Sequence, residues 1–391
     1  MMKTNFDEIV ERRHSGSLKW DGIEERLGIK EKDLLPMWVA DMDFKTPATV
    51  REAISEKLQH GVLGYAGSYD TYYESVLDWM KERYQWTPQK DWMVHGGNLV
   101  SVLTRLIRVY SNPGDKVLIQ PPVYGSFRNL IKSNHREVVE NPLQQTKNGY
   151  EIDFIDFEKK LQEQVSLFLL CSPHNPVGRV WSYEELEKMG SLCKKYNVLV
   201  IADEVHADLT FKNKKHIPFL AVDKAFEENG ILCTAPHKAF NLAGLEISST
   251  FIPSAERRDR YTKEMLRDGY NKPNLLGVTA AEAAYRRGGK WLEEVVDYIE
   301  KNHQYLQERL RQEMPPLHVT EAEAGYLAWI DCRKSGYEAE TLNKAFIKKG
   351  KLLLSNGTGF GTGGEGFFRM NLACPRSVLQ EGVSRLLRSF D

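Results

Sequence analysis

The sequence predicts an α/β protein built on a mostly parallel sheet, and a strand–helix–strand segment in mid-chain is the first reason. Residues 165–171 and 198–202 are apolar runs of strand length. Between them, a Ser182–Glu185 capping box precedes apolar residues at helical spacing, and Asn197 is a candidate left-handed C-cap. Two parallel strands need such a crossover, and their sheet is buried on both faces.

Two further apolar runs extend this sheet. Residues 116–120 follow the turn Asn112–Asp115, and residues 230–234 form another strand-length run. With 391 residues, the chain is long enough for a sizeable core that is divided between two domains.

Chemically useful side chains follow each of these four strands. In chain order they are Tyr124, Asn175, Asp203 and Lys238. Ligands of such sheets bind outside the carboxyl ends of the strands, so the four side chains should meet at one edge. A single residue of this kind would be unremarkable, but four in succession indicate a site.

Composition and charge exclude several functions. The formal net charge of -1 argues against a nucleic-acid or membrane-surface role. The N-terminus lacks the apolar segment of a secretory signal, and the apolar runs are too short to span a bilayer. The five cysteines form no CxxC pair, which indicates reduced thiols and a cytoplasmic protein. His174 and His206 lack the spacing of metal ligands, so we expect no metal site.

The four residues match the needs of one cofactor, pyridoxal 5'-phosphate (PLP). A lysine in a partly dry pocket can lose its proton and form a Schiff base with an aldehyde. A carboxylate keeps the ring nitrogen of PLP protonated, so that the ring can accept electrons. An amide can donate to the 3-hydroxyl oxygen, and an aromatic side chain can stack on the ring. Lys238, Asp203, Asn175 and Tyr124 fill these roles.

Longer motifs resemble a known family over nearly the whole chain. They are SLKWDG (17–22), LPMWVADMDF (35–44), GYAGSYD (64–70), QPPVYGSF (120–127), SPHNPVGRVW (172–181), ADEVHADL (202–209), KAFNLAGL (238–245) and GGEGFFRMNLACP (363–375). The chain resembles the PLP-dependent aminotransferase class I/II superfamily of fold type I. More narrowly, it is similar to the cystathionine β-lyase or cysteine-S-conjugate β-lyase branch, the MalY/PatB type.

The resemblance implies the fold and its division. A large PLP-binding domain with a mostly parallel seven-stranded sheet would cover residues 45–285. A small α/β domain would combine residues 1–44 with residues 286–391. Gly288-Gly289 is the candidate junction, and a long helical segment follows it.

The resemblance also implies roles for individual residues. Lys238 would be the Schiff-base lysine and the catalytic base, Asp203 would pair with the ring nitrogen, and Tyr124 would stack on the ring. Asn175 and His206 would lie near the 3-hydroxyl oxygen.

The substrate and a partner subunit account for the remaining roles. Arg369 would bind the carboxylate of an amino-acid substrate, for which a guanidinium is well shaped. Trp38 and Val39 would line the substrate side together with Tyr124. Tyr65 would reach the phosphate in a partner subunit, which implies a homodimer with shared active sites.

The phosphate end departs from the family pattern. Asn98-Leu99-Val100 replaces the usual Gly-Val-Val before a helix, although Asn can adopt a positive φ as Gly does. His237 replaces the usual Ser before the lysine, and Glu246 stands where some aminotransferases have an Arg. We expect PLP binding to survive but to be weakened.

Residues 359–364 match GxGxxG as a string, but a dinucleotide site needs a helix to follow. Residues 366–371 have a strand pattern instead, so we expect a flexible loop before the strand that carries Arg369.

The expected reaction is β-elimination, in which Lys238 removes the Cα proton and a thiolate leaves Cβ. Cystathionine or another S-substituted L-cysteine would yield a thiol, pyruvate and ammonia. Two alternatives stay open at this point. Transamination to a 2-oxo acid shares the early steps, and a regulatory protein could retain the fold.

Overall fold

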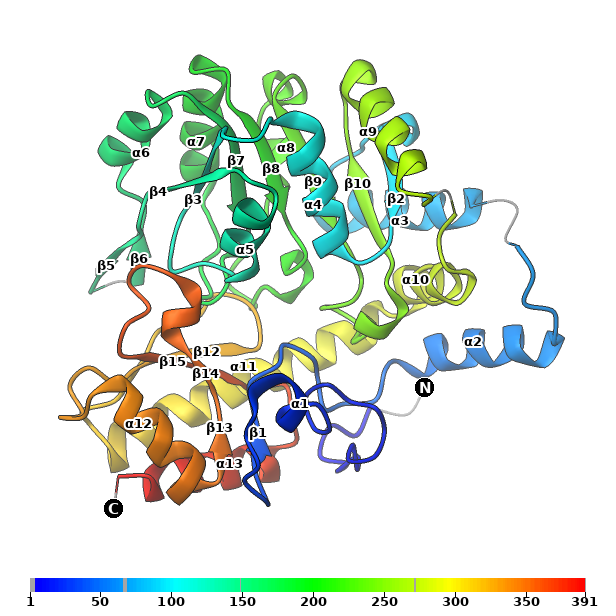
Figure 1. Cartoon of the computed structure of the whole chain (residues 1–391). Coiled ribbons are helices and arrows are strands. Elements are labelled where there is room, and N and C mark those ends of the chain that lie inside the picture. Colours follow the sequence, from blue (N-terminus) through cyan, green and yellow to red (C-terminus); the bar gives the residue numbers. More distant parts are fainter. Residues whose placement is uncertain (1–3, 66–68, 148, 271, 391) are drawn as a thin grey trace.

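The computed structural model describes residues 4–65, 69–147, 149–270 and 272–390, so residues 66–68 of the GYAGSYD motif lie outside it. A seven-stranded sheet forms the centre of the larger part of the molecule (Figure 1). In spatial order its strands are β2 (Met93–Gly96), β10 (Ser248–Phe251), β9 (Gly230–Thr234), β8 (Leu199–Asp203), β7 (Val165–Cys171), β3 (Lys116–Ile119) and β4 (Glu137–Glu140).

The predicted parallel arrangement is confirmed. Strands β9, β8, β7, β3 and β4 pair in parallel, whereas β10 is antiparallel to both of its neighbours. Asp203 is the last residue of β8 and lies beside Cys171 of β7 and Cys233 of β9. The carboxyl ends of three strands are therefore level, and the turns that follow them open onto the same edge.

Both faces of this sheet are buried, which explains the apolar runs. Along β7, Leu167 and Leu169 join one hydrophobic cluster, and Phe168 and Leu170 join the other. One cluster also contains residues of α4 (Leu99–Tyr110), α5 (Ser126–Ser133) and α9 (Ala255–Arg267). The opposite cluster contains residues of α6 (Phe154–Leu161), α7 (Tyr183–Lys195), α8 (Phe219–Val222), α10 (Leu275–Arg287), α2 (Ala48–His60) and α3 (Asp70–Tyr84).

The crossover helix α7 begins and ends as predicted. Ser182 Oγ accepts from the Glu185 N–H, and the Glu185 side chain accepts from the Ser182 N–H, which completes the capping box. Asn197 has a φ of 56°, the left-handed conformation expected after the helix.

The C-terminal part builds a second, antiparallel sheet beneath the first (Figure 1). Its strands are β11 (His318–Val319), β12 (Leu327–Asp331), β15 (Phe367–Asn371) and β14 (Ser355–Asn356). The long helix α11 (Gly289–Glu313) leads into it from the predicted junction, and α12 (Ala339–Ala345) and α13 (Arg376–Arg388) follow.

The N-terminal segment lies against this C-terminal part. After α1 (Ile23–Leu27), strand β1 (Leu35–Pro36) pairs in parallel with β13 (Leu352–Leu353). Leu35 and Met37 share a hydrophobic cluster with residues of α11 and α13. The predicted division of the chain at residues 45 and 285 stays a prediction.

Two short hairpin strands, β5 (Gln144–Thr146) and β6 (Gly149–Glu151), complete the strands of the described residues. No helix within those residues combines the length and apolarity needed to cross a bilayer.

Candidate active site

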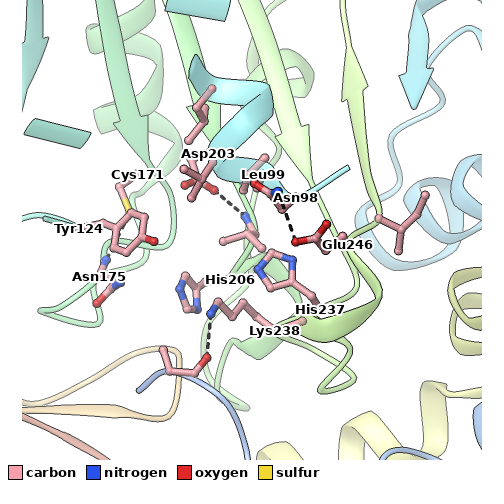
Figure 2. A pocket seen from close by; sticks show the side chains of 16 residues that line it. Asn98, Leu99, Tyr124, Cys171, Asn175, Asp203, His206, His237, Lys238 and Glu246 are labelled. Carbon is pink, nitrogen blue, oxygen red and sulfur yellow. Dashed lines mark hydrogen bonds between the residues drawn. The ribbon is translucent and has the colours of Figure 1, made fainter. Parts of the chain in front are cut away.

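A cavity of about 180 Å³ lies at the carboxyl edge of the large sheet (Figure 2). It brings together most of the side chains that the sequence singles out. Among its lining residues are Asn98, Leu99, Val100, Tyr124, Asn175, Asp203, His206, His237 and Lys238.

Lys238 lies on the cavity wall, four residues after the end of β9, and its amine points away from Asp203 (Figure 2). Its Nζ donates a hydrogen bond to the carbonyl oxygen of Ala40 at 2.7 Å. Burial, together with the positive charge of Arg369, lowers the pKa of Lys238 to about 8. A sizeable fraction of the amine is therefore neutral near neutral pH, as a nucleophile or a base must be.

Asp203 is buried at the end of β8, where it accepts from the Val205 N–H at 3.2 Å. Burial raises the pKa of Asp203 to about 7, although the charge of Lys238 opposes this shift. The negative charge of a buried carboxylate with so little stabilisation would be favoured by a cationic N–H placed in the cavity.

Asn175 lines the cavity, and Arg369 contacts Asn175 without lining the cavity itself. Arg369 is buried in β15, and its Nη1 donates to Asn175 Oδ1 at 3.2 Å. Burial lowers the pKa of Arg369 to about 10, so the guanidinium stays charged. Within the described residues, nothing accepts a hydrogen bond from Arg369 Nε. A cation with an unused donor is suited to binding a carboxylate.

Two histidines add neutral imidazoles. Burial lowers the pKa of His206 to about 3, helped by the charges of Lys238 and Arg369. Burial and the charge of Lys238 also lower the pKa of His237 far below its usual range. Each ring can thus donate one hydrogen bond without carrying a charge.

The N-terminus of α4 lies on the cavity wall, where Asn98, Leu99 and Val100 line it. Its first N–H groups lack acceptors within the helix, which favours an anion there. Asn98 has a φ of -65°, so it does not use the positive φ that the sequence allowed. Its side chain instead accepts from the Ser101 N–H at 2.9 Å and caps the helix.

Glu246 brings a negative charge to this same part of the cavity (Figure 2). It has a φ of 47°, a left-handed conformation, and Asn98 Nδ2 lies 3.5 Å from its Oε1. An anion at the N-terminus of α4 would therefore meet one carboxylate, and the weakening of PLP binding stays a prediction.

Four predicted residues do not line this cavity, namely Arg369, Trp38, Val39 and Tyr65. Trp38 and Val39 contribute backbone carbonyls instead, which accept from Arg369 Nη2 at 2.9 Å and from Asn371 Nδ2 at 2.6 Å. Tyr65 is 95% exposed, and its ring lies 5.3 Å from the Lys272 amine.

Comparisons with known proteins decide the family. Residues 32–386 match the family described as aminotransferase class I and II. The chain is 40% identical over 383 residues to cystathionine beta-lyase PatB of Bacillus subtilis (strain 168), with 98% of each chain covered. The chain belongs to the aminotransferase class I and II family. The predicted branch is confirmed as well.

Solved structures of this family share the whole fold. A PLP-bound putative aminotransferase from Clostridium difficile 630 superposes with a TM-score of 0.97 at 39% identity, and the match covers 100% of both chains. A PLP-bound C-S lyase from Staphylococcus hominis, in complex with L-cycloserine, gives a TM-score of 0.94 at 34% identity. That match covers 100% of this chain and 99% of the other. The predicted fold class, type I of the PLP-dependent transferases, is therefore confirmed.

The sequence reasoning missed several residues at this family site. Cys171 and Ala40 line the cavity, and Tyr326 and Asn371 hold the segment that carries Ala40. The position of Cys171, at the end of a predicted strand, could have indicated it. Backbone carbonyls and buried side chains behind the cavity leave no comparable pattern in the sequence.

The predicted loop before β15 contains a short helical turn, Gly357–Phe360, and its flexibility stays a prediction. A Cβ at Gly125 would lie 2.2 Å from the Gly359 carbonyl oxygen, so this loop packs closely against the turn that carries Tyr124. As predicted, a strand and not a helix follows the GxGxxG string.

Proposed function

We propose that this protein is a PLP-dependent carbon–sulfur lyase. It cleaves L-cystathionine or another S-substituted L-cysteine by β-elimination to a thiol, pyruvate and ammonia. The observation that carries the proposal is one cavity lined by Lys238, Asp203 and Asn175, with Arg369 hydrogen-bonded to Asn175. Its relation to PatB favours the lyase reaction over others of the family.

The residues fit PLP by their chemistry. The amine of Lys238 can bind an aldehyde, and the buried Asp203 carboxylate suits a protonated ring nitrogen. Tyr124 provides an aromatic face, and Asn175 and His206 provide donors for a phenolic oxygen. The N-terminus of α4 would hold the phosphate. When bound, PLP supplies an aldehyde that takes up the substrate amine and a ring that accepts the electrons of the Cα–H bond.

The protein's own groups then position the substrate and move its protons. Arg369 binds the α-carboxylate, with Nε as the donor that has no acceptor among the described residues. Once released, Lys238 Nζ takes the proton from Cα. The electron pair of that C–H bond expels the sulfur from Cβ, and the thiolate leaves and is protonated. Hydrolysis of the remaining three-carbon product consumes one water and gives pyruvate and ammonia.

The test uses the purified protein with PLP and L-cystathionine, without any 2-oxo acid. Thiol and pyruvate are measured together over many turnovers. Equal, catalytic release of both is expected, and Lys238→Ala should abolish it. Absence of both products from the wild-type protein would overturn the proposal.

Transamination is the second candidate, because a solved structure at 39% identity is described as a putative aminotransferase. It uses the same carboxylate and amine groups but returns a proton to the cofactor instead of expelling sulfur. Turnover of an L-amino acid only when a 2-oxo acid is present would favour this reaction.

We also propose a homodimer with shared sites and a cytoplasmic location. Tyr65 is almost fully exposed, and Leu58, Val62 and Leu63 expose apolar side chains nearby in the chain. Such a projecting apolar segment is suited to a contact with a second copy. All five cysteines are buried and free, which agrees with a reducing compartment. Among the described residues no group of three side chains could hold a metal ion, and the expectation of a metal-free site stays a prediction.

A further inference from the structure

The segment 38–42, here called the strap, has no regular structure and contributes Ala40 to the cavity wall, and side chains from other elements bind its carbonyls. Arg369 and Ser355 donate to the Trp38 carbonyl, each at 2.9 Å. Asn371 Nδ2 donates to the carbonyls of Val39 and Asp41, each at 2.6 Å. The strap is therefore fixed on both sides of Ala40.

The carbonyl of Ala40 is the one that faces Lys238. It accepts from Lys238 Nζ at 2.7 Å and from the hydroxyl of Tyr326 at 2.9 Å. A carbonyl oxygen has two lone pairs, so it can accept from both donors at once. The two side chains thus share one acceptor.

The position of the Tyr326 side chain is fixed by its surroundings. It immediately precedes β12, is fully buried and packs edge-on against the ring of His206. Its backbone carbonyl accepts from the Leu372 N–H at 2.7 Å, next to Asn371. Burial raises the pKa of Tyr326 far above its usual value, so the phenol stays protonated and donates. It does not line the cavity itself.

We propose that Tyr326 is a positioning residue. Its hydroxyl holds the Ala40 carbonyl in place, so that this carbonyl binds the free Lys238 amine. Its hydrogen bond also makes the carbonyl a weaker acceptor for the protonated amine. This inference rests on the proposed function, since it concerns Lys238 as nucleophile and base.

The physical argument concerns the two states of the amine. A carbonyl binds an ammonium more strongly than a neutral amine, and so favours the protonated form. A second donor on the same oxygen draws electron density from it and reduces this preference. The other groups that act on the amine are Asp41 and Asp203, which favour its charge, and Arg369, which opposes it. His206 and His237 are neutral neighbours.

Replacing Tyr326 by Phe removes the hydroxyl and keeps the ring. The matched control is Tyr285→Phe, which removes a buried hydroxyl that has no hydrogen-bond partner within the described residues and lies outside the cavity lining. The first measurement is the rate at which full-length protein freed of cofactor captures PLP, followed by absorbance as a function of pH. This rate reports the neutral fraction of Lys238 and does not depend on turnover.

For Tyr326→Phe we expect the midpoint of the capture profile to move up by about half a pH unit or more. In the protein with PLP bound, kcat should fall roughly tenfold because the amine is less well placed, while KM stays within about twofold. Tyr285→Phe should leave all three values unchanged. A purely structural role would lower the melting temperature without moving the midpoint, and an unchanged midpoint with unchanged kcat would overturn the inference.

If Tyr326→Phe does not fold, 3-fluorotyrosine at position 326 decides instead, because its hydroxyl is a stronger donor. The midpoint should then move down, and no movement would overturn the inference. Wild-type protein that fails to capture PLP would instead refute the proposed function itself, so the two failures are distinguishable.

Discussion

Arg369 on β15 and Asn175 in the turn after β7 are joined by a hydrogen bond of 3.2 Å between Nη1 and Oδ1. The bond links the small antiparallel sheet to the large parallel one at the cavity. It also orients the guanidinium. Arg369, which would bind the substrate carboxylate, is therefore in direct contact with Asn175, which would bind the cofactor ring.

Arg369→Lys should therefore impair substrate binding although it keeps the positive charge, because the planar guanidinium is lost. We expect kcat/KM for L-cystathionine to fall roughly a hundredfold, equivalent to about 2.7 kcal/mol, mainly through KM. Steady-state kinetics check this. The control is Arg333→Lys, whose guanidinium pairs with Asp331 outside the cavity lining. A KM within twofold of wild type would contradict the assigned role of Arg369.

Asp203→Asn should increase stability while it removes function. The folded-state pKa of Asp203 is about 7, against 3.8 as the ordinary value, so between these pH values the folded protein binds more protons than the unfolded chain. The free energy of unfolding therefore falls as pH rises through this window. A neutral Asn avoids that loss.

In denaturant unfolding of the cofactor-free protein, we expect Asp203→Asn to be more stable than wild type by about 2 kcal/mol at pH 8, with little difference at pH 4. With PLP bound, its kcat should fall by roughly a thousandfold, since the ring nitrogen loses its counter-charge. If the variant and the wild type were equally stable at both pH values, the charge of Asp203 would be well stabilised in the fold, which would contradict this prediction.

Glu246→Gln should tighten PLP binding. The carboxylate lines the end of the cavity at the N-terminus of α4, where it would repel a phosphate. We expect the dissociation constant for PLP to fall roughly threefold to tenfold at low salt, with a smaller effect at high salt because ions screen the repulsion. Equilibrium titration measures it. Glu256→Gln, on α9 and outside the cavity lining, is the control.

Tyr65 allows a test of shared sites that does not depend on any single variant being active. Tyr65→Ala should change the free energy of unfolding by less than about 0.5 kcal/mol, because the side chain is exposed. It should nevertheless weaken PLP binding. If Tyr65 acts on the partner's site, mixing Tyr65→Ala subunits with Lys238→Ala subunits creates hybrid dimers with one intact site. The activity of the mixture should then exceed the sum of the two separate variants, and mixtures that show no such increase would argue against sharing.

Much of the large sheet could be predicted because burial on both faces leaves a plain pattern. The runs at 165–171 and 230–234 match β7 and β9, and the capping box marks the start of α7. Strand ends were less certain. Strand β8 begins one residue later than predicted and includes Asp203, because the ladder with β9 extends to Asp203, which pairs with Cys233.

Some of the cavity residues could likewise be predicted from the sequence, and others could not. Lys238, Asp203, Asn175 and Tyr124 could be found because parallel strands deliver the residues that follow them to one edge. The conformation of Asn98 could not be found, since capping and a left-handed turn are both open to an asparagine. Its neighbours in space, including Glu246, decided for the cap.

The sequence by itself determined the order of strands and helices and the residue types at the sheet edge, since these follow from local spacing and from the rule that parallel strands share a direction. Only the tertiary structure decided what surrounds them. The strap lies 198 residues before Lys238 in the chain, yet its Ala40 carbonyl receives the lysine amine, and Tyr326 reaches the same oxygen from a third segment. Such contacts depend on backbone atoms that are the same in every residue, so no sequence pattern can encode them locally.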